Sequence, residues 1–109
     1  MLGGMYANGY GVTIDYAEAV KWYRLSAKQG FIVAQYSLGG MYAKGQGVLQ
    51  DLVMAYVWYN VSAANGVRLV KAARDSVLAR LSASERKLGR KLSKLCFKKP
   101  AKCPEYSDD

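Results

Sequence analysis

The chain has no histidine, only two cysteines, and half as many acidic as basic side chains. Without histidine, a tetrahedral zinc site would have to be assembled from distant carboxylates, and the most common general base of enzymes is missing. The sequence also lacks an apolar run of about 18 residues, the length that suggests a membrane-spanning helix. We therefore expect no metal, no cofactor and no transmembrane segment.

A secretory signal peptide is also missing from the first residues. Met1 to Gly11 is neither basic nor long enough in apolar residues to match one. We expect that export would need a leader outside these 109 residues.

What the sequence does contain is an internal repeat. Leu2 to Gly30 and Leu38 to Gly66 align without a gap, 36 residues apart, and are identical at 16 of 29 positions. The shared residues are Leu2/Leu38, Gly3/Gly39, Gly4/Gly40, Met5/Met41, Tyr6/Tyr42, Ala7/Ala43, Gly9/Gly45, Gly11/Gly47, Val12/Val48, Asp15/Asp51, Ala19/Ala55, Trp22/Trp58, Tyr23/Tyr59, Ser26/Ser62, Ala27/Ala63 and Gly30/Gly66. Self-similarity at a fixed period of about 20 to 50 residues is typical of stacked repeats.

Each copy has the pattern of a helical hairpin. The first helix of the second copy has apolar residues at helical spacing: Ala34, Leu38, Met41 and Tyr42. Gly45 and Gly47 then allow a turn, and Asp51 is placed as the N-cap of a second helix. The packed face of that helix is formed by Ala55, Trp58, Tyr59, Ser62 and Ala63, and Gly66 follows it. In the first copy, Asp15 and Glu18 have the spacing of a capping box, and Gly30 is the matching terminal glycine.

The combined pattern LGGMY, GxGV, D, AxxWY, SA and G resembles the Sel-one-like repeat (SLR) family, which is related to the tetratricopeptide repeats. The resemblance is strong from Met1 to about Gly66 and weak beyond it. It implies an all-α protein, an α-solenoid of helical hairpins with a right-handed superhelix. In such a solenoid the first (A) helices line a concave face and the second (B) helices a convex one. The resemblance also implies a protein-binding adaptor, as in bacterial SLR proteins, but no one partner.

Beyond Gly66 the repeat decays. Helical spacing continues at Val70, Ala73, Val77 and Leu81, and Ser82 to Glu85 has a capping-box pattern that opens a last helix. That helix has one apolar stripe, Leu88, Leu92, Leu95 and Cys96, and Pro100 ends it. We expect one domain over residues 1–109: repeat one at 1–30, repeat two at 31–66, a degenerate third A helix at 67–81, a basic capping helix at 82–99 and a tail at 100–109.

The first A helix is shortened, because only Met1 precedes Leu2. Its apolar side, Leu2, Met5 and Tyr6, lacks the shielding of a capping repeat. The hypothesis that follows is self-association through this N-terminal edge. A frayed terminus and a longer solenoid are the alternatives.

The correspondence with tetratricopeptide repeats predicts a partner-binding groove on the concave face. Its members in the second repeat are Val33, Tyr36, Gly40, Ala43 and Lys44. One period earlier they are Gly4, Ala7 and Asn8, and one period later Leu69, Ala72, Ser76, Ala79 and Arg80. Asn8, Lys44 and Arg80 would form a polar row beside a shallow apolar floor, which suits an extended or helical peptide.

Several repeated residues have a structural interpretation. Glycine pairs inside the A helices, such as Gly39 and Gly40, cost helix stability and so indicate close helix packing. Trp22, Tyr23, Trp58 and Tyr59 could form an aromatic box, but their helical spacing favours core packing, with the tyrosine hydroxyls and indole N–H groups reaching the surface. Gly45-x-Gly47 has no preceding strand, so a turn is favoured over a phosphate loop.

The positive charge is regional. Residues 68–102 contain twelve Lys or Arg and two acids, a local charge of +10, whereas residues 1–67 carry +1 and residues 103–109 carry −3. A solvated cap is the first interpretation, followed by a face for an acidic protein. A membrane surface and nucleic acid come last, and no recognition motif for nucleic acid is present.

Cys96 and Cys103 flank Pro100. A disulfide between them would tether the tail, and the loop-entropy model gives it about 2.5 kcal/mol. The pairing resembles the cysteine-paired tails of exported SLR proteins. It favours a periplasmic or secreted protein if the bond forms, and a cytoplasmic one otherwise.

Enzymatic activity is the alternative function. The cysteine-rich branch of the family is associated with penicillin binding and β-lactamase activity, but this chain has no cysteine pair within its hairpins. It also lacks a histidine base, and we expect no Ser-x-x-Lys element and no close carboxylate pair on the predicted groove. Ser26 and Ser62 recur at a small-residue packing position. We therefore predict a protein-protein adaptor and not an enzyme.

Overall fold

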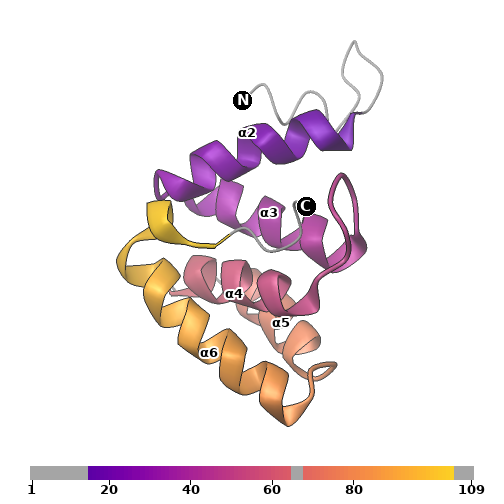
Figure 1. Cartoon of the computed structure of the whole chain (residues 1–109), viewed down its shortest axis with the longest axis vertical. Coiled ribbons are helices and arrows are strands. Elements are labelled where there is room, and N and C mark those ends of the chain that lie inside the picture. The colour runs from indigo at the N-terminus through magenta and orange to yellow at the C-terminus, as the bar shows by residue number, and fades with distance from the viewer. Residues whose placement is uncertain (1–14, 65–67, 105–109) are drawn as a thin grey trace.

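The computed structural model describes residues 15–64 and 68–104 of the chain (Figure 1). These residues form α2 (Tyr16–Lys28), α3 (Ile32–Lys44), α4 (Leu52–Ala63), α5 (Arg68–Leu78), α6 (Ala83–Lys98) and the short 3-10 helix η1 (Pro100–Lys102). No strand occurs within the described ranges. The prediction of an all-α solenoid is confirmed.

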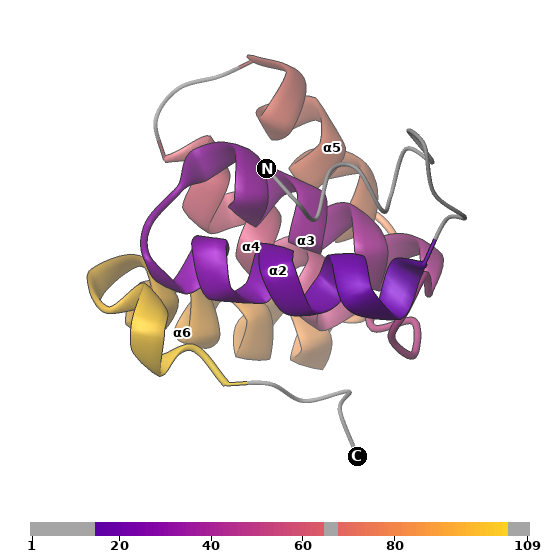
Figure 2. The same ribbon diagram turned by 90° about the horizontal axis from the view of Figure 1, so that it is seen from above.

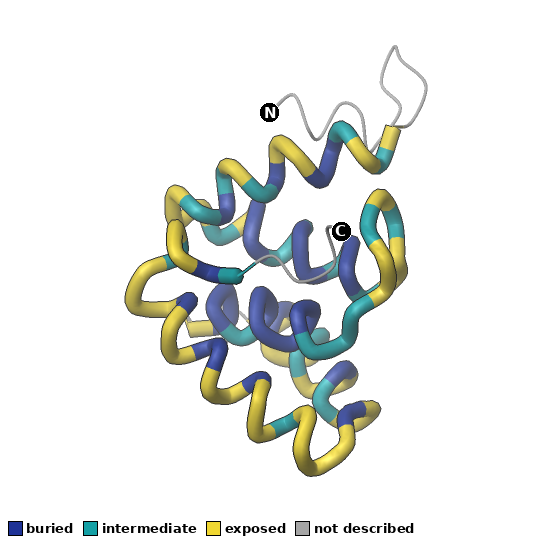
Figure 3. Tube along the Cα trace, in the orientation of Figure 1, coloured by how far each residue is buried: buried dark blue, intermediate teal, exposed yellow. Residues whose placement is uncertain are grey.

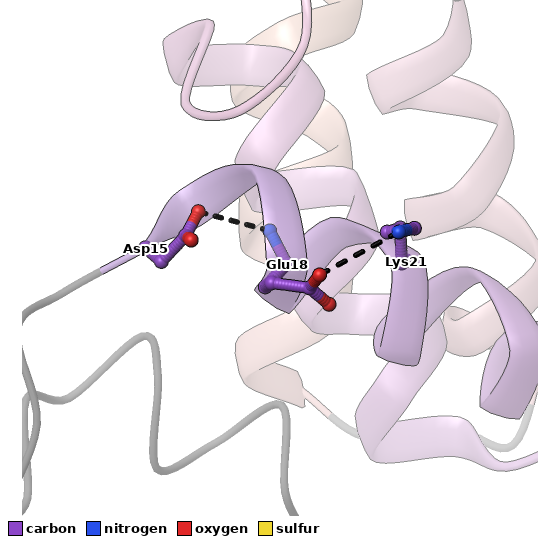
Figure 4. A network of polar contacts seen from close by, with 3 residues as sticks. All are labelled: Asp15, Glu18 and Lys21. Atoms are coloured by element: carbon purple, nitrogen blue, oxygen red, sulfur yellow. Dashed lines mark hydrogen bonds and ion pairs between the residues drawn. The ribbon is translucent and has the colours of Figure 1, made fainter.

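Short polar side chains cap the N-termini of three helices: Asp15 caps α2, Asp51 caps α4 and Ser82 caps α6. Asp15 Oδ1 accepts a hydrogen bond from the backbone N–H of Glu18 at 3.1 Å. Asp51 Oδ1 accepts from Met54 N–H at 3.1 Å, so both N-cap predictions are confirmed. The capping box expected for α2 is only half formed, because the Glu18 carboxylate lies 3.5 Å from Lys21 Nζ, one turn further along (Figure 4).

Glycines with positive φ end the helices where the sequence predicted turns. Gly30, at φ +94°, follows α2, and Gly45 and Gly47, at +70° and +77°, follow α3. Residues with a Cβ rarely adopt these angles, so the two hairpin connections depend on glycine. Gly66, the expected equivalent after α4, lies outside the described residues.

The helices stack in chain order from α2 to α4. α2 packs against α3, α3 packs against α4, and α4 in turn packs against both α5 and α6. The view from above places α5 and α6 on opposite sides of the stack (Figure 2). α5 and α6 are not packed against each other along their lengths, so α4 joins the two C-terminal helices to the repeats.

The core is centred on α4, as the burial colouring shows (Figure 3). Nine of its twelve residues are buried, and its Trp58 and Met54 are among the largest fully buried side chains together with Leu38 and Tyr42 of α3. Buried polar groups lock the neighbouring helices together. Gln35 Nε2 donates to the carbonyl of Ala27 at 3.1 Å, which satisfies an amide that would otherwise be costly to bury.

Two packing predictions need correction. Trp22 of α2 is 39% exposed, although its repeat partner Trp58 is 2% exposed. α4 packs against three other helices, whereas α2 packs against α3 and η1 within the described chain, so the same residue finds fewer neighbours. The aromatic core therefore contains Tyr23, Trp58 and Tyr59 but not Trp22.

The apolar stripe of α6 is rotated relative to the expectation. Leu92 and Cys96 are buried, but Leu88 and Leu95 are each 43% exposed. The buried face consists of Gly89, Leu92, Ser93 and Cys96, which have the i, i+3, i+4, i+7 spacing of one helix side. Gly89 and Ser93 face α4 in place of the expected Leu88 and Leu95. Small residues are needed there because α6 lies close to α4: a Cβ at Gly89 would be 2.7 Å from the Tyr56 ring.

A disulfide joins Cys96 at the end of α6 to Cys103 after η1, with the two Cα atoms 4.6 Å apart. Both cysteines are buried, and η1 contacts α6 on one side and α2 on the other. The bond therefore holds the chain after Pro100 against the first described helix. No helix in residues 15–64 and 68–104 has the length and apolar character needed to cross a membrane.

Candidate protein-binding surface

The described part of the predicted groove consists of eight residues, five on α3 and three on α5 or the turn that follows it: Val33, Tyr36, Gly40, Ala43 and Lys44, then Ala72, Ser76 and Arg80. Val33, Lys44 and the three C-terminal residues are exposed, while Tyr36, Gly40 and Ala43 are half-buried. Leu69 and Ala79, named with them, are also exposed. Asn8, Gly4 and Ala7 lie outside the described residues, as does the shortened first A helix.

The structure brings three of these groove residues, Tyr36, Gly40 and Lys44, into one hollow of about 390 Å³. The hollow lies between α2, α3 and α4, and we call it the tyrosine hollow. Its other lining residues are Tyr16, Tyr23, Ser37, Met41, Gln46 and Tyr59. The α5 residues Ala72 and Ser76 do not line it. The predicted groove is thus gathered at α3 and does not continue into the same hollow at α5.

The sequence analysis did not include three tyrosines of this lining in the groove. Tyr23 and Tyr59 of the B helices were assigned to the core with their hydroxyls reaching the surface, and Tyr16 was given no role. Each of the three reaches the hollow, although Tyr23 and Tyr59 are 7% exposed. A tyrosine ring can pack in the core while its hydroxyl reaches the surface, and this amphipathic character is the sequence signal for their place in the lining.

Two glycines of α3 allow Tyr59 to lie at the base of the hollow. A Cβ at Gly39 would be 2.7 Å from Cδ1 of the Tyr59 ring, and one at Gly40 would be 3.4 Å from its hydroxyl oxygen. The rings of Tyr36 and Tyr59 are 5.5 Å apart between centroids and tilted by 39°. The glycine pair therefore serves close helix packing, and Gly40 also leaves the Tyr59 hydroxyl accessible.

The electrostatics of the tyrosine hollow favour hydrogen bonding over ionic chemistry. Burial raises the pKa of Tyr59, and the neighbouring Tyr36 raises it further. Tyr59 is therefore a neutral phenol at physiological pH, able to donate and accept hydrogen bonds. Lys44 is the one cation among the lining residues, and no carboxylate lines the hollow within the described residues. Such a surface can recognise peptide carbonyls and side chains but offers no proton-transfer pair.

Signals for catalysis are weak in the described ranges. No group of three or more His, Cys, Asp or Glu side chains in them could hold a metal ion. The expectation of no Ser-x-x-Lys element is wrong, because Ser84 and Lys87 have the spacing found in some acyl-transferring enzymes, but both are exposed in the first turns of α6. The Ser84 hydroxyl lies 3.3 Å from the Ser82 hydroxyl, which belongs to the helix cap. The Ser-x-x-Lys segment is therefore part of the N-terminal cap and first turns of α6.

The second candidate surface is the outward side of α6. Four exposed lysines recur along it, Lys87, Lys91, Lys94 and Lys98, and we call them the lysine ridge. The acid of this helix, Glu85, is engaged elsewhere: its carboxylate accepts from Ser82 N–H at 2.8 Å, and this hydrogen bond lowers its pKa. The ridge therefore keeps its positive charge, as a solvated cap or a face for an acidic partner would require.

The Sel1 repeat family model matches residues 1–31 and 32–67. The chain belongs to this family, which is the one that the sequence resembles. The fold also matches solved bacterial structures. It superposes on a protective antigen of uropathogenic Escherichia coli with an SLR fold at a TM-score of 0.86, with 33% identity over 92% of this chain and 22% of that one.

A second solved structure, a Sel1 repeat protein from Oxalobacter formigenes, superposes with a TM-score of 0.65 and 45% identity over 69% of this chain and 56% of that one. This chain therefore spans about a fifth of the first relative and just over half of the second. No curated protein sequence is significantly similar to it. Sel1 repeat proteins are generally protein-interaction scaffolds, and the SLR fold is typically non-enzymatic.

Proposed function

We propose that this protein is an adaptor that binds a peptide or protein partner on its concave surface, at the tyrosine hollow and at the exposed groove residues of α3 and α5. The single observation that supports the site is the hollow of about 390 Å³ lined by Tyr36, Gly40, Lys44 and the hydroxyl-bearing rings around them. Tyrosine combines a large apolar surface with a hydrogen-bonding tip at low entropic cost, which is why it is enriched at interfaces.

An extended or helical peptide is the preferred occupant. The tyrosine hollow is open, its hydroxyls can bond peptide groups, and Val33 adds an exposed apolar surface at the start of α3, 69% exposed. Lys44 lines the hollow and Arg80 is exposed in the turn after α5, and both are cations that can orient acidic positions of the peptide. This arrangement corresponds to recognition of a peptide by a groove lined with helices.

The test is a comparison of captured proteins from the native extract. Immobilised wild-type protein is compared with the double variant Lys44→Glu, Arg80→Glu and with the control Lys87→Glu, Lys91→Glu, which makes the same charge change on the lysine ridge. We expect the first variant to lose a prey that both the wild type and the control retain. A prey retained by the first variant and lost by the control would move the binding site to α6.

We propose an oxidising compartment, periplasmic or secreted, for this chain. The Cys96–Cys103 disulfide supports it, since such bonds persist outside the reducing cytosol. Mass spectrometry after thiol alkylation of protein from its native source should find both cysteines blocked. Two free thiols would favour the cytoplasm. Self-association through the first A helix stays a prediction, because that helix lies outside the described residues.

The alternative hydrolase function has no supporting contact among the described residues. Neither the tyrosine hollow nor the first turn of α6 brings a nucleophile to a base. Purified protein should therefore leave a chromogenic β-lactam unhydrolysed beyond the rate of buffer. Rapid turnover would overturn the adaptor assignment.

A further inference from the structure

A second hollow, of about 390 Å³, lies where the two C-terminal helices separate. α4 packs against α5 and against α6, but α5 and α6 are not packed along their lengths, so a gap is left between them beside α4. We call it the C-terminal hollow. Nothing in the repeat pattern predicts it, because a regular third hairpin would close the gap with direct contacts between its two helices.

The floor of the C-terminal hollow is small and largely apolar. Val61 of α4, 4% exposed, and Ser93 of α6, 5% exposed, lie at its base. The Ser93 hydroxyl donates to the carbonyl of Gly89 at 2.7 Å, so it presents no unsatisfied donor to the hollow. Phe97, 60% exposed, forms an apolar wall. A single bulky apolar side chain would replace water there and gain contact with the phenyl ring.

Three cations surround this apolar floor: Arg74 of α5, and Arg90 and Lys94 of α6. Arg74 is held in place, because its Nε lies 2.9 Å from Asp75 Oδ1 and its Nη1 lies 3.4 Å from Asn60 Oδ1. Arg90 and Lys94 are exposed and form no ion pair within the described residues. The mouth of the hollow therefore keeps at least two uncompensated positive charges.

We infer that the C-terminal hollow binds a segment of a partner protein that carries one bulky apolar side chain flanked by carboxylates. The apolar side chain would lie on Val61 and against Phe97, and the carboxylates would bind Arg90 and Lys94. Charge complementarity selects this occupant, since guanidinium groups bind carboxylates in a two-pronged geometry and the cations outnumber the acid at this site. The site is separate from the tyrosine hollow and shares no lining residue with it.

The test uses a short end-blocked peptide with a tryptophan flanked on each side by aspartate and glutamate, titrated by calorimetry at physiological salt. We expect the variant Arg90→Glu, Lys94→Glu to bind at least about tenfold more weakly than the wild type, a difference of about 1.4 kcal/mol. The matched control Lys87→Glu, Lys91→Glu changes the same charge on the same helix outside the hollow. It should weaken binding by less than about threefold, because salt screens the interaction between the peptide and exposed charges outside the hollow.

Two further arms test the apolar contact and the location. Phe97→Ala, at an exposed position that leaves the fold intact, should also weaken binding, as should replacing the peptide tryptophan with alanine. Lys44→Glu should have no effect, which separates this site from the tyrosine hollow. Circular dichroism of each variant verifies the fold.

The inference is overturned if the peptide does not bind at about 1 mM, or if the variant and the control weaken binding equally. The chain's own acidic segment at 105–109 is the competing occupant. Binding that strengthens several-fold when residues 105–109 are deleted would assign the hollow to this segment and would likewise overturn the partner assignment.

Discussion

α4 and α6 each follow an A helix or its degenerate equivalent in the chain, yet they differ in how much of their surface they bury. α4 buries nine of its twelve residues and has no charged residue, whereas α6 buries four of its sixteen and is dominated by lysine and arginine. α4 is surrounded by three helices, while α6 packs against α4 and η1 within the described chain. The number of neighbours, more than the position in the repeat, decides what each helix can bury.

The two regions also use different means to hold their helices. Around α4 the helices are locked by packing and by buried hydrogen bonds, such as Ser62 Oγ to the carbonyl of Ile32 at 3.2 Å. α6 depends on local devices: a complete capping box at Ser82 and Glu85 and the disulfide at its end. The repeats are therefore stabilised mainly by tertiary contacts, and α6 adds a complete capping box and a crosslink to its packing against α4.

The largest expected effect comes from the two equivalent tryptophans. Trp58→Ala removes a ring that is 2% exposed and should cost about 3–5 kcal/mol of unfolding free energy. Trp22→Ala removes a ring that is 39% exposed and should cost about 1 kcal/mol or less. Urea denaturation followed by circular dichroism measures both. Equal losses would contradict the account of burial by number of neighbours.

Removing the disulfide should have the next largest effect. The double variant Cys96→Ala, Cys103→Ala should lower the unfolding free energy by about 2.5 kcal/mol, because the seven-residue separation no longer restricts the unfolded chain. Hydrogen exchange should increase most in η1 and the end of α6, whereas core amides of α3 should exchange faster only by the amount that the lower global stability sets. No increase in η1 and the end of α6 would contradict a local role for the crosslink.

Close packing at glycine can be tested on both sides of α4. Gly39→Ala places a Cβ 2.7 Å from the Tyr59 ring and should cost about 1–3 kcal/mol. A Cβ at Gly89 of α6 would likewise be 2.7 Å from Cδ2 of the Tyr56 ring, so Gly89→Ala should lower stability by a similar amount. Gly40→Ala meets only the Tyr59 hydroxyl at 3.4 Å and serves as the control, with stability unchanged or raised by up to about 1 kcal/mol because alanine favours the helix. Thermal melts that rank Gly40→Ala with the other two would refute this.

The smallest effects are those of pH, and they separate the two regions. The pKa of Glu85 is lowered in the fold, so its contribution is present above its ordinary value of 4.5 and is lost as the pH falls below it. The pKa of Tyr59 is raised, so its contribution is present below 10.0 and is lost as the pH rises above it. Melting temperatures of Glu85→Gln should decline less in acid than those of the wild type, and melting temperatures of Tyr59→Phe should decline less in alkali. Wild-type slopes in both variants would contradict the pKa directions.

The repeat made much of the fold predictable. Identical residues at Asp15 and Asp51, and at Gly39 and Gly40, identified caps and close approaches that depend on local sequence. Trp22 could not be placed in this way, because its burial depends on what packs beside α2 and not on its own repeat. The stripe of α6 was misassigned because Gly89 and Ser93, small and polar, do not appear apolar in a periodicity count.

The candidate site was predictable only in outline. Tyr36, Gly40 and Lys44 were expected at the groove from the family correspondence, and they do lie in one hollow. The B-helix tyrosines in the lining and the whole C-terminal hollow were not predicted. Both depend on how neighbouring helices are arranged in space. A sequence fixes which side of a helix is apolar, but it does not show where two helices diverge.

The most direct measurement for the adaptor account is photo-crosslinking in the native extract from two exposed positions. A benzophenone side chain replaces Val33 on α3, 69% exposed, or Leu25 on α2, 56% exposed. The account predicts a specific crosslinked partner from position 33, lost in the Lys44→Glu, Arg80→Glu background, and none from position 25. A partner captured from position 25 and not from position 33 would contradict it.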